Sequence, residues 1–353
     1  MSPAQADGQE LRLNRPWSGR PLVAGRLSAL VALLVVLGVA LGAGKFAVPA
    51  VDLLRVFLAP LTGHDPGVSE IVYTVIWNIR VPRVVAGVVV GAALAAAGAA
   101  YQGMFRNPLV SPDILGVSAG AGLGATLGIY LGWSLAWVQL TAFAGGLLAV
   151  IVVYRLATLV QRHDPMLVLV LAGIAVSALL GAGISLLKIL ADPYTQLPSI
   201  TFWLLGGLNQ VTLDDVAVTT PAMLIGLLPL ALLRWRLNLL ALADEEAAAL
   251  GLQVDRLRLV LVASATLTTA AAVSLAGIVG WIGLVVPHVA RLLVGPDFSR
   301  LLPASLLLGA GFLVVTDTLA RTVTSIELPL GILTALVGAP FFLWLLARTG
   351  RAP

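Results

Sequence analysis

The sequence predicts an all-α, polytopic membrane protein with about ten transmembrane helices. Of the 353 residues, 59% are hydrophobic and only 11% are charged, and the mean hydropathy is +1.01. Soluble domains carry about a quarter charged residues, so no water-soluble fold could bury this much apolar surface. Strand-like alternation of apolar and polar residues is absent, which favours helices that satisfy their own backbone hydrogen bonds in lipid.

Ten apolar runs of about 20 residues, separated by charged residues, proline or glycine, are the predicted membrane spans. They are residues 27–46, 83–104, 113–131, 135–154, 166–190, 214–234, 258–278, 283–294, 301–320 and 331–347. The eighth run is too short to cross a bilayer comfortably. The first run could instead be the core of a signal peptide, but the polar segment before it is long and no small-residue cleavage site is followed by a polar chain.

The distribution of basic residues predicts the orientation of these spans. Ten spans place both ends of the chain on one side of the membrane. With the N-terminus inside, the inner segments hold 15 lysines and arginines and the outer segments hold 6. Because cytoplasmic segments carry the excess of basic residues, we expect a multi-pass protein of the bacterial inner membrane. Its transmembrane domain is then 27–348, and the two tails that flank it in sequence, 1–26 and 349–353, both lie in the cytoplasm. Residues 47–82 are expected outside and 235–257 inside.

Helix order and orientation suggest an inverted repeat. One span begins after Arg83 and runs inward, and another begins after Arg258 and runs outward. Each opens a block of four helices, and such inverted repeats commonly build transport pathways. The two blocks share negligible sequence identity, so an inverted four-helix repeat is predicted from topology alone.

Four glycines recur at a spacing of four in the third span: Gly116, Gly120, Gly124 and Gly128. This spacing places them on one face of a helix. Small faces let helices approach closely in lipid, where no hydrophobic force drives them together. The pattern therefore predicts tight helix packing, or alternatively a sliding surface beside a pathway.

Ionisable residues are scarce in the middle of the spans. Asp113 opens the third span, Asp317 lies four residues before Arg321 near the outer boundary, and His288 follows a proline. Ion-coupled carriers usually keep an Asp, Glu or His in mid-membrane, so this pattern argues against an ion-coupled secondary transporter, which stays the alternative. The chain has no cysteine and no His/Asp/Glu cluster with metal-ligand spacing, which argues against an intramembrane enzyme and against a cofactor of its own.

The inner segment 235–257 reads WRLNLLALADEEAAALGLQVDRL and contains a predicted amphipathic helix from Leu239 to Leu250. Three adjacent carboxylates, Asp244, Glu245 and Glu246, lie within it, and Gly251 follows as a helix stop. A helix lying in the lipid interface prefers a basic polar face because the inner leaflet is anionic. The acidic face favours docking into a cytoplasmic protein instead.

Three arginines are expected on the outer side: Arg80 and Arg83 before the second span, and Arg321 after the ninth. Basic residues on that side run against the usual bias. They could reach the lipid headgroups by snorkelling. Alternatively they form a docking surface for an acidic extracytoplasmic protein, because arginine pairs with carboxylates in a bidentate manner.

Three long blocks of the sequence resemble the FecCD family of ABC importer permeases, the type II importers of ferric siderophores, haem and cobalamin. The first block is RVPR followed by GVVVGAALAAAGAAYQGMFRNPLVSPDILGVSAGAGLGA, the second is LNLLALADEEAAALGL, and the third begins GIVGWIGLVVPHVARLLVGPDFSRLLPASLLLGAGFLVVTDTLARTV and continues with ELPLGILTALVGAPFFLWLL. The blocks follow the family's order, and the resemblance covers about residues 70–350.

The resemblance implies a BtuC-like fold and a homodimer of ten-helix subunits with the solute path along the dimer axis. It also implies two cytoplasmic ATP-binding subunits and one periplasmic substrate-binding protein, besides contact with membrane lipid and none with nucleic acid. The chain lacks a phosphate-binding GxxxxGK[ST] loop. It is therefore expected to be no enzyme itself, with ATP and Mg bound by the partner. The implied solute is an iron chelate, either haem or a ferric siderophore, or cobalamin, with the iron chelate favoured.

The resemblance also implies roles for individual residues. Binding-protein docking is assigned to Arg80, Arg83 and Arg321, and the cytoplasmic gate to Asn107 and Leu109, which an Asn-Pro pair alone would make an ordinary turn. The helix that couples to the ATPase would present Leu242, Asp244, Glu245, Glu246, Ala248 and Gly251. The pathway-lining candidates are Gly173, Ser177 and Gly181, which core packing could also explain.

Overall fold

The computed structural model describes residues 22–63, 65–160 and 165–349 of the chain, and every regular element in these ranges is a helix. Six of the described helices are long and apolar enough to cross a membrane, and four shorter apolar helices accompany them. Each predicted span corresponds to one of these helices, so the all-α, polytopic fold class is confirmed. Most of the predicted tails, 1–26 and 349–353, lies outside the described residues.

The helices follow one another along the chain in the predicted order. Those that correspond to predicted spans are α1 (Leu22–Gly42), α4 (Val81–Met104), α5 (Val117–Tyr130), α6 (Leu135–Leu159), α7 (Pro165–Leu190), α9 (Leu213–Leu232), α12 (Val254–Ala276), α13 (Ile282–Val294), α14 (Phe298–Thr322) and α15 (Leu330–Thr349). The shorter elements are α2 (Ala50–Thr62), α3 (Glu70–Thr74), the π-helix η3 (Val75–Arg80), the 3₁₀-helix η4 (Pro112–Leu115), α8 (Gln196–Leu205), α10 (Arg234–Leu239) and α11 (Asp244–Ala249). The expected short eighth span is α13, with 13 residues.

The second span begins earlier than predicted. The elements α3, η3 and α4 form one continuous helical stretch of 35 residues. The predicted start at Arg83 is wrong because Arg80 and Arg83 resemble boundary charges, whereas both are buried inside the fold. Pro82 has no N–H, and the π-helix before it, in which the Val81 N–H donates to the Ile76 carbonyl, accommodates this irregularity.

Two helices outside the ten spans, α2 and α8, are not predicted from the sequence. They have 13 and 10 residues, which is too short for a search that looks for runs of span length. The helix α2 occupies much of segment 47–82 and buries Val56 against Val72 and Ile76. A small apolar cluster of its own therefore holds this segment to the start of the second span.

The third span is shorter than predicted and is broken near its start. Residue 113 belongs to η4, and Gly116 then adopts a left-handed conformation with φ +81° before α5 begins. Gly116 is therefore not on a helical face with the other three glycines. A Cβ on Gly120 or Gly124 would lie 2.3 or 2.0 Å from a backbone carbonyl oxygen of α6, and Gly128 also contacts that helix. The predicted tight packing is confirmed for these three glycines.

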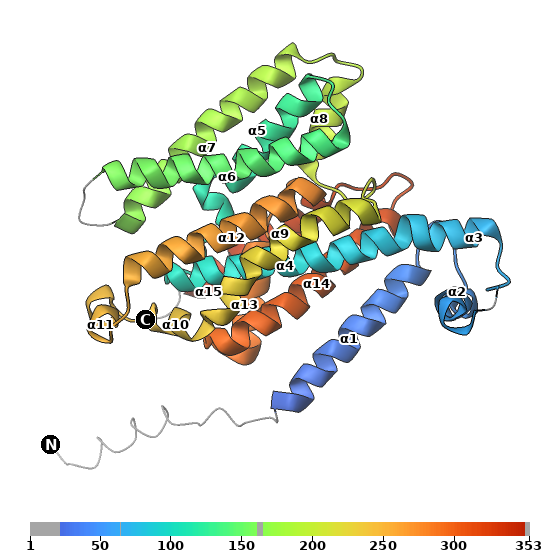
Figure 1. Cartoon of the computed structure of the whole chain (residues 1–353), viewed down its shortest axis with the longest axis horizontal. Helices are drawn as coiled ribbons and strands as arrows, with labels where there is room; N and C mark the ends of the chain where they lie inside the picture. The colour runs from blue at the N-terminus through green and yellow to red at the C-terminus, as the bar shows by residue number, and fades with distance from the viewer. Residues whose placement is uncertain (1–21, 64, 161–164, 350–353) are drawn as a thin grey trace.

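The helix α4 lies in the middle of the bundle and packs against α9, α12, α13 and α14, while α5, α6 and α7 lie together beyond α12 (Figure 1). Its contacts with α13 and α14 bring backbone against backbone. A Cβ on Gly91 would lie 2.2 Å from the Gly309 carbonyl oxygen, and a Cβ on Gly98 would lie 1.9 Å from that of Gly283. Contacts this close make α4 and its neighbours the tightly packed centre of the molecule.

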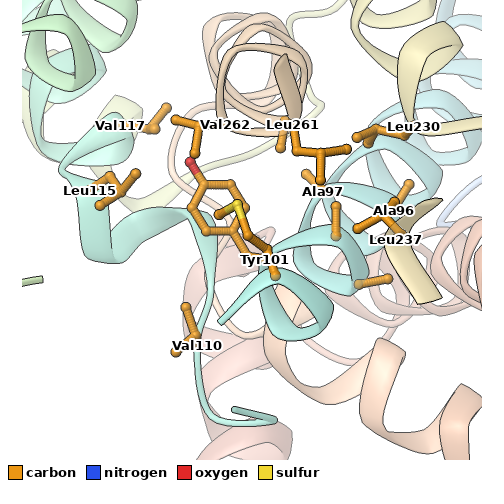
Figure 2. Packing of buried hydrophobic residues seen from close by; sticks show 14 of the residues in the cluster. Ala96, Ala97, Tyr101, Val110, Leu115, Val117, Leu230, Leu237, Leu261 and Val262 are labelled. Carbon is orange, nitrogen blue, oxygen red and sulfur yellow. The ribbon is translucent and has the colours of Figure 1, made fainter. Parts of the chain in front are cut away.

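One buried side chain at the far end of α4 fixes the segment that follows it. Figure 2 shows Tyr101 within the buried cluster beside Leu115, Val117 and Val262. The side chain is fully buried, and its hydroxyl oxygen lies 3.3 Å from the Thr266 hydroxyl oxygen. Tyr101 thus joins α4 to η4, α5 and α12, so the turn between α4 and η4 starts from a rigid base.

The residues predicted for docking, for the gate and for coupling to the ATPase lie at the two ends of this bundle. We call the end where α4 begins and α14 ends the arginine end, because it carries Arg80, Arg83 and Arg321. At the opposite end, the loop end, α4 runs into the turn 105–111, and α10 and α11 follow α9 (Figure 1). The helix α1 runs toward the arginine end and α15 runs away from it, so the described chain begins and ends on the loop-end side.

Candidate functional site

Arg83 is the centre of an ion-pair network at the arginine end. Its guanidinium Nη2 lies 2.7 Å from Asp317 Oδ1, and its Nη1 lies 3.0 Å from both carboxylate oxygens of Glu327. The Arg83 and Asp317 side chains are 7% and 3% exposed, and that of Glu327 is 38% exposed. One side chain of α4 thus holds both the end of α14 and the loop that leads to α15.

The other two arginines hold the end of α1. The last carbonyls of a helix have no partner within it and carry the negative end of its dipole. Arg80 donates to the carbonyls of Leu41 at 2.5 Å and Gly42 at 2.8 Å, and also to that of Phe46. Arg321 donates to the carbonyls of residues 40 and 43, and its Nε lies 3.4 Å from Asp317 Oδ2. This ion pair joins residues four positions apart on α14, a spacing that places both on one face of the helix.

The structure therefore brings the three predicted docking arginines together but buries them. Arg80, Arg83 and Arg321 are 4%, 6% and 7% exposed, and each guanidinium has acceptors within the chain. Their contacts hold α1, α4 and α14 together, whereas docking stays a prediction. Sequence reasoning missed Glu327, whose only signal is an acidic side chain in an expected outer segment, 244 positions after Arg83.

A cavity of about 610 Å³ opens beside this network. Arg83, Asp317 and Glu327 lie on one wall, and the aromatic side chains of Trp133 and Phe202 belong to another part of its lining. The cavity brings the ends of α5, α8, α12 and α14 to a common opening. Arg83 is thus largely buried by its own carboxylate partners and also lines a cavity at the arginine end.

At the loop end, the turn 105–111 has a defined hydrogen-bonded shape. The Asn107 side-chain oxygen accepts from the Leu109 N–H at 2.9 Å, and the Asn107 N–H donates to the Gln102 carbonyl at 3.2 Å. Asn107 is exposed and Leu109 is partly buried. The turn expected from the Asn-Pro pair is confirmed, and the gate assigned to Asn107 and Leu109 stays a prediction.

The predicted single helix from Leu239 to Leu250 is wrong. The helix α10 ends at Leu239 where the predicted helix should begin, and within residues 240–250 only α11 is helical; Ala243, just before α11, has an extended conformation with ψ 151°. The side chain of Asn238 explains the break, because it bonds Asp297 Oδ1 and the N–H of residue 298, each at 2.7 Å, and so fixes the end of α10 against α14. The helix stop expected at Gly251 is confirmed, since it adopts φ +83° just after α11.

The carboxylates of α11 face different surroundings. Asp244 lies 2.8 Å from Arg258 Nη1 and Nη2 and 2.5 Å from Arg106 Nη2. The Arg258 guanidinium, and after it that of Arg106, holds the pKa of the Asp244 carboxyl below its ordinary value. Glu245 and Glu246 are exposed, and neither has an ion-pair partner among the described residues.

The open face of α11 is partly apolar as well as acidic. Leu242, Ala248 and Leu250 are exposed beside the two glutamates, and Ala247 is the residue that packs inward. Leu242, which the family resemblance assigns to the face that couples to the ATPase, is thus exposed, whereas that assignment itself stays a prediction. An exposed face of this kind fits a protein partner better than it fits water alone.

A sequence profile of the FecCD transport family matches residues 30–348. The chain belongs to this family. A cobalamin import permease, BtuC, of Halobacterium salinarum is 46% identical over 209 residues, which are 59% of this chain and 56% of that protein. The hemin transport permease HmuU of Yersinia pestis is 40% identical over 59% of this chain and 61% of its own length. The chain thus spans less than two thirds of these two relatives.

Two further relatives match almost the whole chain. The ABC transporter permease YvrB of Bacillus subtilis is 38% identical over 330 residues, which are 92% of each protein. A solved structure of a metal-chelate type ABC transporter in an inward-facing conformation superposes with a TM-score of 0.79 and 34% identity, over 92% of this chain and 99% of that one. The family and the fold therefore extend across both ends of the bundle.

In this FecCD chain, the pathway-lining candidates on α7 do not share one environment. A Cβ on Gly173 would lie 2.0 Å from the Ile114 carbonyl oxygen, and the Ser177 hydroxyl lies against Gly116. Both residues therefore face η4 within the chain. A Cβ on Gly181 would have no neighbour within 4 Å among the described residues, so Gly181 is the candidate with open space beside it. Lining of a pathway stays a prediction for all three.

Proposed function

We propose that this chain is the membrane-spanning permease subunit of an ATP-driven importer that moves an iron chelate, either haem or a ferric siderophore, or cobalamin, into the cytoplasm. The observation that carries the proposal is the likeness to a metal-chelate type ABC transporter over 99% of that chain. The relatives' names support the solute class, since they include hemin, iron chelatin and Fe(3+) dicitrate permeases as well as a cobalamin permease. Iron chelates are the more frequent among them.

The partners are inferred from the residues that are exposed or reach a cavity at the two ends of the bundle. Two cytoplasmic ATP-binding subunits, which bind ATP and Mg, dock on the exposed face of α11 in a homodimer of this chain. The exposed Glu245 and Glu246, without partners in the described residues, support this role. The loop end is then cytoplasmic in the bacterial inner membrane, as the excess of basic residues in the segments assigned to that side indicates.

A periplasmic substrate-binding protein docks at the arginine end. Arg83 is the arginine that a partner can reach, because it lies on the wall of the 610 Å³ cavity. Both carboxylate oxygens of Glu327 already accept from Nη1 of Arg83. A carboxylate of the binding protein therefore competes with Glu327 for this guanidinium, while Arg80 and Arg321 keep α1 in place.

Transport in this scheme alternates access to a path between the two copies. ATP binding and hydrolysis in the partner move α11, and the turn with Asn107 and Leu109 opens or closes the cytoplasmic side. The described spans carry few charged side chains, so a large solute meets no strong binding site on the way. Selectivity rests with the binding protein.

Reconstitution tests the proposal. The chain is placed in liposomes with its ATP-binding subunits and binding protein, and uptake of labelled haem, a ferric siderophore or cobalamin is measured with and without ATP. We expect uptake of one of these solutes that requires ATP and stops when the phosphate-binding lysine of the ATP-binding subunit is replaced. Uptake by the chain alone, driven by a proton or sodium gradient, would instead establish the ion-coupled alternative.

A further inference from the structure

One side chain links the segment before α11 to the turn 105–111. Arg106 donates from Nε to the Leu240 carbonyl at 2.7 Å and from Nη2 to Asp244 Oδ1 at 2.5 Å. These two acceptors lie at the two ends of the short connection between α10 and α11. A planar guanidinium that holds two acceptors at once fixes direction as well as distance. Arg106 therefore clamps the start of α11 to the residue next to Asn107.

The backbone of Arg106 makes this clamp short and stiff. Arg106 has φ +51° and is one of two non-glycine residues with positive φ in the described chain. Its N–H donates to the Gly103 carbonyl at 3.3 Å, and the next residue, Asn107, closes the turn onto Leu109. A non-glycine residue whose backbone is held at a positive φ indicates that the surrounding structure requires the residue there. A displacement at Asp244 thus reaches Asn107 through a single side chain.

A second arginine binds the same carboxylate from a different element. Arg258, near the start of α12, makes two contacts of 2.8 Å to Asp244. Arg258 ties α11 to the bundle, whereas Arg106 ties α11 to the turn. Both arginines carry one positive charge and bind Asp244, but they connect it to different elements. Arg258 can therefore be substituted as the matched control for Arg106.

We propose that Arg106 is the positioning residue through which movement of α11 reaches the turn that contains Asn107 and Leu109. The inference rests on the proposed function, since it assigns a route between the ATPase-docking helix and the gate. The Arg106 and Asp244 side chains are 38% and 48% exposed, and ion pairs of this kind contribute little to stability. The role of Arg106 is therefore to keep α11 and the turn 105–111 in a fixed relative position, and it contributes little to the stability of the fold.

The test compares uptake with ATP hydrolysis in the same reconstituted complexes. We expect R106A to lower the solute imported per ATP by roughly fivefold or more, the usual range of coupling between two sites, with hydrolysis retained. R258A, which removes an equal charge from Asp244, should stay near the wild-type ratio. R106K should recover part of the ratio because an ammonium can still pair with Asp244. Asparagine tolerates a positive φ, but its side chain is too short to bind Asp244. We therefore expect R106N to behave like R106A.

The outcomes separate the link from the proposed function. If the wild-type complex shows no ATP-driven uptake, the proposed function fails. If the wild-type complex transports and R106A keeps its ratio of uptake to hydrolysis, the link is wrong. Full recovery in R106N would also overturn it, because the backbone conformation alone would then be sufficient.

A covalent link provides a second test that does not depend on loss of function. The chain has no cysteine, so R106C/D244C introduces the only two thiols of the subunit. A short flexible bifunctional thiol reagent then replaces the lost ion pair. If α11 and the turn move as one body, the ratio of uptake to hydrolysis is low before cross-linking and rises after it. A complex that loses all uptake on cross-linking would show that the two segments must separate, and would overturn the proposal.

Discussion

The arginine end and the loop end use the same arginine–carboxylate chemistry in opposite surroundings. At the arginine end, the Arg83 and Asp317 side chains are 7% and 3% exposed, whereas at the loop end those of Arg106 and Asp244 are 38% and 48% exposed. Breaking a buried pair leaves a charge without water or partner, while water replaces the partner of a half-exposed charge. The arginine end is therefore built to stay together, and the loop end is built to rearrange.

This contrast is tested most strongly by D317N, for which we expect the largest loss of stability. The substitution keeps the shape of the side chain but removes the carboxylate that Arg83 and Arg321 share. Loss of one partner from a buried ion pair costs about 3 kcal/mol or more. The measurement is the free energy of unfolding of the chain in detergent micelles.

The matched variant for D317N is D244N, which makes the same change at the loop end. Because Asp244 is half exposed, we expect a loss below about 1 kcal/mol. Equal losses for the two variants would contradict the assignment of a rigid end and a mobile end.

Packing along α4 gives a second and smaller contrast, between the middle of this helix and its loop end. A Cβ on Gly91 would lie 2.2 Å from the Gly309 carbonyl oxygen, so G91A must force α4 and α14 apart and should cost roughly 1–3 kcal/mol. Toward the loop end of the same helix, a Cβ on Gly103 would have its nearest neighbours at 4.0 Å. G103A should be neutral or slightly stabilising, because alanine is the better helix former. Thermal unfolding of the two variants is measured side by side, and a destabilised G103A would contradict the open space beside Gly103.

The ten spans could be predicted because lipid places a strong and local demand on sequence. A helix in hydrocarbon needs a continuous apolar run, and the predicted limits 135–154 and 166–190 lie close to those of α6 and α7. The connections are harder to predict, because a charged residue usually marks the end of a span. That rule fails at Arg80 and Arg83, whose guanidinium groups are satisfied inside the fold.

The networks at both ends could be predicted only as lists of charged residues. Arg83 meets Glu327 across 244 positions, and Arg106 meets Asp244 across 138. No local pattern encodes a pairing over such a separation. The break between α10 and α11 has the same origin, since Asn238 is held by Asp297 from another helix. Side chains that bridge distant elements therefore escape sequence reasoning even where the elements themselves do not.

Glu327 allows the docking proposal to be sharpened at the arginine end. E327Q keeps the shape of the side chain and leaves Asp317 on Arg83, so the loss of stability should stay below about 1 kcal/mol. Removal of the internal competitor should strengthen binding of the substrate-binding protein, measured as the dissociation constant with the reconstituted permease. The control is E70Q, which removes an equal charge from the exposed start of α3. If E327Q and E70Q bind the substrate-binding protein with the same dissociation constant, Glu327 does not compete for Arg83.

The smallest effect concerns pH and distinguishes the two ends without a large change in stability. The folded-state pKa of Asp244 lies below its ordinary value, chiefly because of Arg258 and then Arg106. A depressed folded pKa gives stability that is present above the unfolded pKa of about 4 and is lost as the pH falls through the folded value. The difference in unfolding free energy between the wild type and D244N should therefore be constant from neutral pH down to about pH 5 and shrink below about pH 4. A difference that changes between pH 8 and pH 6 would mean that another group controls this end, and Asp244 would then not be the charge that the loop end relies on.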